Sequence, residues 1–277
     1  LKMSGQFPDK CKIGDVRDLK SLRDTITGDV VIHLAAVHRD DVRDKAEYQR
    51  TNVDGAQNVA TVCSEKRINK IVFTSTVAVY GFAEPGTDES GAINWFNEYG
   101  RTKFGAEEKL RAWQADGDNS LIIVRPTVIF GEGNRGNVFN LLNQIASGRF
   151  LMVGTGDNKK SMAYISNVVA FLETCVATDQ KYGVYNYVDT PDLTMNELVS
   201  QVRAKLNGKN GVGLRLPYWL GMMLGHVADV VAKISGKTLP ISSIRVKKFT
   251  SSTQFNSSKL NLENFEPPFR LSEGVER

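Results

Sequence analysis

The sequence predicts an α/β fold in which a doubly wound parallel sheet is joined by a smaller α/β domain. Three near-continuous apolar runs, at 30–36, 71–79 and 121–131, predict strands that helices cover on both faces. The stretches at about 45–63 and 99–114 carry apolar residues at helical spacing and predict helices between those strands. Strands that alternate with helices in this way are typical of parallel βαβ units.

Composition restricts the partners and the compartment. The 277 residues suffice for one large domain or two coupled ones. The formal net charge is +4, without a basic stripe interleaved with aromatic residues, which argues against nucleic acid and suits an anionic small substrate. Cys11, Cys63 and Cys175 are widely spaced, which argues against disulfides or a metal site and favours a cytoplasmic protein. No apolar run reaches the roughly 18 residues of a membrane span.

Three side chains indicate redox chemistry on an alcohol. Tyr99 and Lys103 are four residues apart and would share one face of a helix. A cation there is expected to lower the pKa of the phenol and prepare it for proton transfer. Thr76 follows a strand, at the sheet edge where α/β proteins present groups to ligands. Since no side chain carries hydride, such a site needs a nicotinamide. Taken singly, a Tyr-x-x-x-Lys pair is often fortuitous and Thr76 is an ordinary strand residue.

The order of these features resembles the extended short-chain dehydrogenase/reductase family. A strand, the Thr76 hydroxyl, a Val79-Tyr80-Gly81 turn, an acidic loop and the Tyr99/Lys103 helix follow one another as in its NAD-dependent epimerases and dehydratases of nucleotide sugars. The resemblance implies a Rossmann-type sheet and catalytic roles for Thr76, Tyr99 and Lys103. It also implies a cofactor domain at 1–130, to which 162–178 return, and a substrate domain at 131–161 and 179–277.

The resemblance further implies which residues bind NAD. Asp15 in a Gly-Asp-x-Arg-Asp element would approach the adenine, and Asn52 would support the active-site backbone. His33, by contrast, is expected to pack within its strand. The cofactor-binding residues that the resemblance implies are Asp15, Leu34, Ala35, Ala36, Asn52, Thr74, Ser75, Tyr99, Lys103, Pro126 and Thr127.

The glycine fingerprint for the pyrophosphate is not found. Lys12-Ile13-Gly14 reads as a short strand, but no G-x-x-G-x-x-G follows any strand in the sequence. The unit that normally carries this fingerprint, about 30 residues or more, would hold the central strand of the sheet. We expect either that the sequence is a piece of a longer enzyme, the reading we favour, or that the protein is a shortened relative. NADP is not excluded, because the segment that reads the ribose 2′ position belongs to the same unit.

The resemblance places substrate contacts mainly in the second domain. Asn137, at the predicted start of a helix, would contact a nucleoside diphosphate or serve only as a helix cap. Lys160 stands where many relatives have arginine, and a lysine there lacks the bidentate fork for phosphate. The substrate-binding residues that we expect are Thr76, Asn137, Val153, Lys160 and Arg245.

The stretch 214–234 is amphipathic and has two possible roles. It fits a helix that roofs the substrate domain or a membrane-seeking helix, and its few cations favour the roof. The helices near Asn52 and Tyr99 correspond to a dimer interface in relatives, so a homodimer is implied. The apolar spacing alone would fit core packing equally well.

The reaction that the resemblance favours is epimerisation at C4 of a UDP-hexose by transient hydride transfer. A 4-ketoreductase is the alternative, as is a non-catalytic Rossmann-fold binding protein if the glycine loop is truly missing. A reductase of a non-sugar ketone is a third interpretation. A dehydratase is disfavoured, because Val77-Ala78 replace the Asp-Glu pair that the family's dehydratases carry.

Overall fold

A four-stranded parallel sheet forms the centre of the larger lobe. The computed structural model describes residues 7–39, 42–134, 136–236, 239, 241–257 and 260–277. The order of the strands is β1 (Val31–His33), β2 (Lys70–Thr74), β3 (Ser120–Pro126) and β8 (Tyr182–Tyr187). Each neighbouring pair is parallel, so the carboxyl ends of the four strands share one edge.

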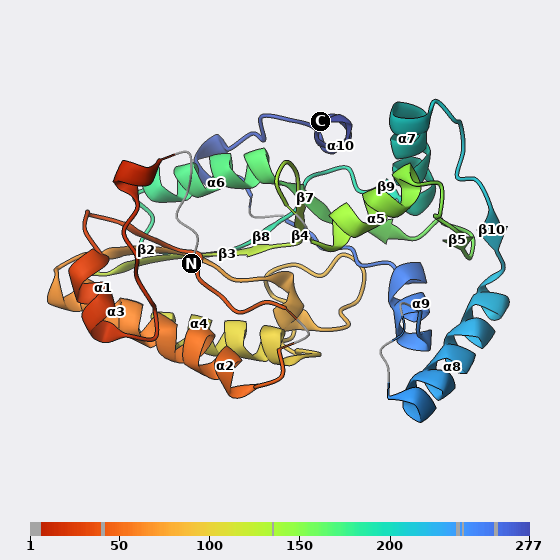
Figure 1. The fold of residues 1–277 in the computed structure, drawn as a ribbon. Coiled ribbons are helices and arrows are strands. Elements are labelled where there is room, and N and C mark those ends of the chain that lie inside the picture. The colour runs from red at the N-terminus through yellow and green to blue at the C-terminus, as the bar shows by residue number, and fades with distance from the viewer. Residues whose placement is uncertain (1–6, 40–41, 135, 237–238, 240, 258–259) are drawn as a thin grey trace.

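Helices cover both faces of this sheet (Figure 1). One layer contains α1 (Leu19–Thr25), α3 (Gly55–Glu65) and α4 (Glu98–Ala115), and the opposite layer contains α6 (Ile165–Ala177). Such cover explains why β3 is buried along its whole length, including its polar residues. The doubly wound α/β fold predicted from the apolar runs is therefore confirmed.

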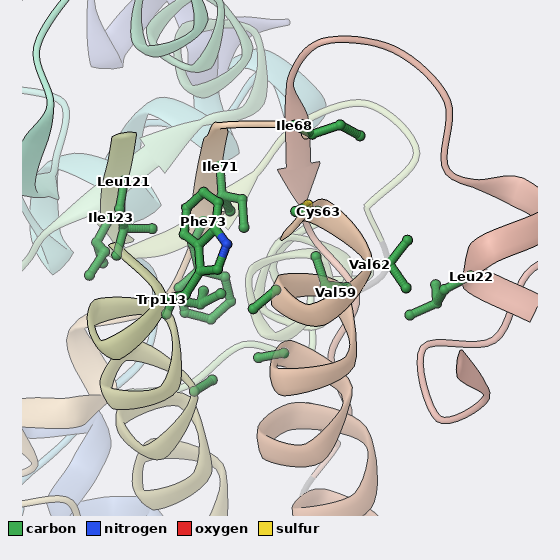
Figure 2. Close-up of a cluster of buried hydrophobic side chains, with 14 residues drawn as sticks. Leu22, Val59, Val62, Cys63, Ile68, Ile71, Phe73, Trp113, Leu121 and Ile123 are labelled. Carbon is green, nitrogen blue, oxygen red and sulfur yellow. The ribbon is translucent and has the colours of Figure 1, made fainter. Parts of the chain in front are cut away.

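The core beneath α3 and α4 is closely filled by aliphatic and aromatic side chains. Figure 2 shows Phe73 of β2 and Ile123 of β3 in the same cluster as Trp113 of α4 and Val59 of α3. A second cluster, on the other face, packs Phe171 of α6 against the sheet. The sheet therefore contributes side chains to two cores.

The smaller lobe is assembled from helices and three two-stranded ladders. The ladders pair β4 with β7, β5 with β10 and β6 with β9. Their strands are β4 (Val128–Phe130), β5 (Met152–Val153), β6 (Lys159–Lys160), β7 (Met162–Tyr164), β9 (Leu193–Thr194) and β10 (Arg215–Leu216). The helices are α5 (Asn137–Ala146), α7 (Met195–Asn207), α8 (Tyr218–Ser235), α9 (Ser243–Thr250) and α10 (Leu271–Glu276). Short 3-10 turns occur at η1 (Pro8–Lys10), η3 (Val77–Tyr80) and η4 (Leu262–Asn264). Among the described residues, no helix has both the length and the apolar character needed to span a bilayer.

Some local predictions were wrong. Residues 12–14 form no strand. The run at 71–79 is extended only to Thr74, and Val77–Tyr80 turns into η3 because the Thr76 hydroxyl accepts a hydrogen bond from the Ala78 N–H and caps that turn. β8 was placed in the second domain, but it pairs with β3 in the large sheet. The remaining domain division stays a prediction.

The helix predicted from about Lys45 to Cys63 contains a π turn. α2 (Ala46–Tyr48) continues into η2 (Gln49–Asp54), which is wound as a π-helix, and then into α3. Asn52 in this turn is buried; its side chain accepts from the Val37 N–H at 2.7 Å and donates to the Val37 carbonyl and to Thr102 Oγ1. The turn thus joins the segment after β1 to α4.

Truncation of Ile123 tests the core beneath α3 and α4. Ile123 is fully buried, so Ile123→Ala should lower the free energy of unfolding by about 2–5 kcal/mol. Urea denaturation of the full-length protein measures this change. Ile13→Ala is the control, because Ile13 is 68% exposed and its truncation should change the free energy by less than about 0.5 kcal/mol. Equal effects of the two substitutions would contradict this packing.

Candidate active site

Thr76 and Tyr99 meet at the carboxyl edge of the sheet. Tyr99 lies in the first turn of α4, which Asn97 caps by accepting a hydrogen bond from the Gly100 N–H at 2.9 Å. Its phenol hydrogen-bonds with the Thr76 side chain, two residues beyond β2. Burial raises the pKa of Tyr99, and the bond with Thr76 opposes that rise in part. The two groups predicted to act on one substrate oxygen are therefore neighbours.

Lys103 lies one turn further along α4 and is almost completely buried. Its Nζ lies 4.1 Å from the centroid of the Phe73 ring. Burial lowers the pKa of Lys103 to about 7, against the opposing effect of Glu107. The expectation that Lys103 lowers the pKa of Tyr99 is wrong for this structure, because burial of the phenol dominates.

Several predicted cofactor residues share the edge where Tyr99 lies. Residues 34–36 follow β1, residues 74–76 end and follow β2, and residues 126–127 end and follow β3. Thr127 is anchored there, since its N–H donates to the Tyr187 carbonyl at 3.0 Å. Among the described residues, Thr74 Oγ1 is buried without a hydrogen-bond partner. An orphaned hydroxyl at this edge fits a site that a polar ligand such as NAD completes.

Two other predicted residues have clear local roles. Asp15 accepts hydrogen bonds from the Arg17 side chain and backbone, which lower the pKa of its carboxyl to about 2. Arg17 also pairs with Glu47 at 2.6 Å. His33 packs within its strand as expected: it stacks on Phe73, and burial lowers its pKa to about 3.

Three of the predicted substrate residues gather around α8 and α9. Val153 packs against Gly221 of α8. Lys160 donates to the carbonyls of Lys248 and Ser251 at the end of α9, where a cation offsets the helix dipole, so it is occupied as a helix cap. Arg245 lies in α9 itself and donates to the Leu239 carbonyl at 3.1 Å.

Asn137, the fourth residue, begins α5, and the residue at the cap position is Gly136. The interpretation of Asn137 as the helix cap is therefore wrong, and its side chain lies outside the described part of the structure.

A buried ionic network supports this site, and sequence reasoning missed it. Glu107 of α4 receives hydrogen bonds from Arg125 of β3 at 2.9 and 2.6 Å, from Ser75 at 2.5 Å and from Arg111 at 2.6 Å. Arg125 also donates to the Tyr80 hydroxyl, which in turn donates to Asn186 of β8. One signal in the sequence could have revealed this network: Glu107 and Arg125 are charged residues within the apolar patterns at 99–114 and 121–131.

The network fixes the turn that carries Thr76. Ser75 precedes Thr76 directly, and Tyr80 ends the 3-10 turn that follows it. Gly81 closes the turn at φ +66°, where an added Cβ would come within 1.9 Å of the Asn94 carbonyl oxygen. A side chain at position 81 is therefore incompatible with this backbone.

Two hollows of the described structure lie elsewhere. One, of about 810 Å³, is lined by residues of β8 and η4. The other, of about 500 Å³, lies between α5 and the C-terminal residues 274–277. Neither is lined by Thr76, Tyr99 or Lys103. The candidate site is therefore defined by the sheet edge and its polar groups.

Replacement of Glu107 tests the network. Glu107→Gln leaves the buried Arg125 without a counter-charge and should cost about 3–5 kcal/mol of unfolding free energy. Hydrogen bonds and cations lower the pKa of folded Glu107, so its contribution is complete above its ordinary pKa of 4.5 and lost as pH falls through the lowered value.

Urea denaturation at pH 7 and at pH 4 measures both effects. The control is Glu108→Gln, which removes the exposed carboxylate next along α4 and should leave stability and its pH dependence nearly unchanged. A Glu107→Gln protein as stable as the wild type at pH 7 would exclude this role.

Comparisons with known proteins agree with this arrangement. The model of the NAD dependent epimerase/dehydratase family matches residues 5–187. The chain is 48% identical over 275 residues to the N-acetyl-alpha-D-glucosaminyl-diphospho-ditrans,octacis-undecaprenol 4-epimerase of Escherichia coli O157:H7, covering 98% of this chain and 83% of that protein. It is 27% identical over 264 residues to the UDP-glucose 4-epimerase of Vibrio cholerae, covering 90% of this chain and 75% of the relative.

A solved structure supports the same fold. The UDP-glucuronic acid 4-epimerase of Bacillus cereus in complex with NAD superimposes with a TM-score of 0.71 at 21% identity, covering 94% of this chain and 75% of the other. A likeness at this identity shows the Rossmann-type fold alone. The family match and the 48% relative confirm the resemblance seen in the sequence. The chain therefore belongs to the NAD-dependent epimerase/dehydratase family of enzymes.

Proposed function

We propose that this protein is an NAD-dependent 4-epimerase of an N-acetylhexosamine linked to a diphosphate. The observation that carries the proposal is the contact of Tyr99 with Thr76 at the carboxyl edge of the sheet, with the buried Lys103 one turn away. The Escherichia coli relative supports the choice of reaction and sugar.

In the proposed reaction Tyr99, as phenolate, takes the proton of the C4 hydroxyl, while Thr76 hydrogen-bonds the same oxygen. NAD, when bound, supplies the acceptor and later the donor of the C4 hydride. Tyr99 then returns the proton to the C4 oxygen once the sugar has presented its other face.

For cofactor binding we propose the sheet-edge residues at 34–36, 74–75 and 126–127, together with Lys103. Asn52 would act indirectly, by holding Val37 and Thr102. Asp15 remains a proposed adenine contact. To bind the base, its carboxylate would have to give up a hydrogen bond from Arg17.

The carrier of the sugar separates two candidate substrates. The relative at 48% identity favours a diphospho-polyprenol. The 27% relative from Vibrio cholerae favours a UDP-hexose, as predicted from the sequence. A 4-ketoreductase is distinguished from a 4-epimerase acting on either substrate because it consumes one reduced nicotinamide for each product formed. A homodimer and a cytoplasmic location remain predictions, which sedimentation and cell fractionation would test.

Substitution of Tyr99 tests the proposed function. Tyr99→Phe removes one hydroxyl and should lower the epimerisation rate by about 10²–10⁴-fold, because the acid/base group is lost. The full-length protein with NAD⁺ is incubated with N-acetylglucosaminyl-diphospho-undecaprenol and, separately, with UDP-N-acetylglucosamine. The released sugars are then identified by NMR.

The control is Tyr218→Phe, which removes the hydroxyl of an exposed residue on α8 and should leave the rate on the UDP-linked sugar unchanged. Wild-type activity of Tyr99→Phe would remove Tyr99 from the chemistry. Absence of epimerisation by the wild-type protein on both substrates would refute the proposed function.

A further inference from the structure

The outward face of α8 is apolar. Gly221 and Gly225 lie on the opposite face of this helix, in close contact with Val153 of β5 and with the backbone at Ser243 of α9. The outward residues recur at helical spacing and are all exposed, with Trp219 at 67% and Ile234 at 82%. This apolar stripe consists of Trp219, Met223, Val227, Val230 and Ile234.

The interpretation of 214–234 as a roof over the second domain does not account for this exposed stripe. α8 packs on β5 and α9 through Gly221 and Gly225, and Asp229 bonds to Ser243 of α9. In Figure 1, α8 lies beside α9 at the far end of the smaller lobe, away from the large sheet. Contiguous apolar surface of this kind marks a docking face in a folded protein.

Positive charge is concentrated in the same segment. Residues 218–250 hold five lysines and arginines and one acidic residue, Asp229, so their net charge equals the +4 of the whole chain. The cations are Lys233, Lys237, Arg245, Lys247 and Lys248. The Asp229 carboxylate accepts hydrogen bonds from the Ser243 N–H and hydroxyl, so it is bound to α9.

We propose that the α8–α9 segment, residues 218–250, docks on the surface of an anionic phospholipid bilayer. The apolar stripe would lie among the acyl chains near the headgroups, and Lys233, Lys247 and Lys248 would face the lipid phosphates. α8 carries Asp229, His226 and Lys233 within its 18 residues, which suits a helix lying in the interface rather than one crossing it. The inference rests on the proposed function in one respect: a polyprenol-linked sugar is presented at a membrane.

Contacts connect the docking segment to the candidate active site. Lys248 of α9 lies over the Phe96 ring, 4.5 Å from its centroid, and Phe96 is three residues before Tyr99. Phe96 also packs edge-on against Phe82, and both rings are largely exposed. α9 thus connects α8, where the bilayer would be held, to the segment that leads into Tyr99.

Vesicle binding tests the proposal. The full-length protein is sedimented with vesicles of phosphatidylcholine alone and of phosphatidylcholine mixed with phosphatidylglycerol. We expect binding to the anionic vesicles that weakens with added salt. Val230→Ser combined with Ile234→Ser should reduce the partition coefficient by about tenfold for each side chain, since each removes a buried aliphatic group.

The matched control is Leu206→Ser, an exposed apolar residue on α7 of the same lobe, which should bind vesicles as the wild type does. Circular dichroism and thermal melting verify that all variants are folded. Lys247→Gln with Lys248→Gln should reduce binding to the anionic vesicles and its salt dependence.

Three results would overturn the proposal. They are no binding of the wild type to either vesicle, unchanged binding of Val230→Ser/Ile234→Ser, and a dimer that this double variant dissociates without any lipid binding. The last result would assign the stripe to self-association. Epimerisation of UDP-N-acetylglucosamine, measured on the same proteins without vesicles, separates the proposed function from the docking proposal. Loss of this activity would leave the vesicle-binding result unaffected. Normal activity without vesicle binding would refute docking and leave the proposed function intact.

Discussion

The ion pair of Glu107 with Arg125 is the contact on which the site depends. Both side chains are almost fully buried, and neither charge is tolerable there without the other. The pair joins α4 to β3, and Ser75 bonds to the same carboxylate. Tyr99 is two turns before Glu107 on the same helix, and Thr76 is the residue after Ser75. One carboxylate therefore sets the positions of the helix and the strand end that bear the two candidate catalytic groups.

The network extends beyond the site to the far side of the sheet. The Tyr80 hydroxyl accepts a hydrogen bond from Arg125 and donates one to Asn186 of β8. The Asn186 N–H donates in turn to Glu89 of the acidic loop at 2.8 Å. The loop between Gly81 and Tyr99 is thus attached to the strand that forms the other edge of the sheet. Such side-chain networks specify one arrangement of elements, because each alternative leaves a buried polar group unpaired.

The sequence predicted the layers well and the polar core poorly. Continuous apolar runs such as 121–124 are sufficient to predict buried strands, and the apolar spacing at 99–114 is sufficient to predict α4. Periodicity did not reveal that Arg125 faces Glu107, because the pairing joins residues from two elements. Nor did periodicity reveal that Lys160 caps the end of α9, because that end lies about ninety residues further along the chain.

Spacing also misjudged the electrostatics of the active site. A lysine four residues after a tyrosine shares its helix face, but the charge that reaches the phenol depends on burial of both groups. Here Lys103 lies over the Phe73 ring, and Tyr99 is itself largely desolvated. A one-dimensional pattern identifies the two residues, whereas their protonation depends on three-dimensional surroundings.

The π turn at Gln49–Asp54 shifts the phase of one long helix. Its extra residue changes the phase of the helix between α2 and α3, and Asn52 and Val53 within the turn are buried. Asn52 sits at the offset, with its amide between Val37 and Thr102. A relative aligned here as an uninterrupted α-helix would be displaced by one position on one side of the turn. In a surface loop such a misalignment would have little consequence. Here it would assign the neighbour of Asn52 to the buried position between Val37 and Thr102, where the amide makes its hydrogen bonds.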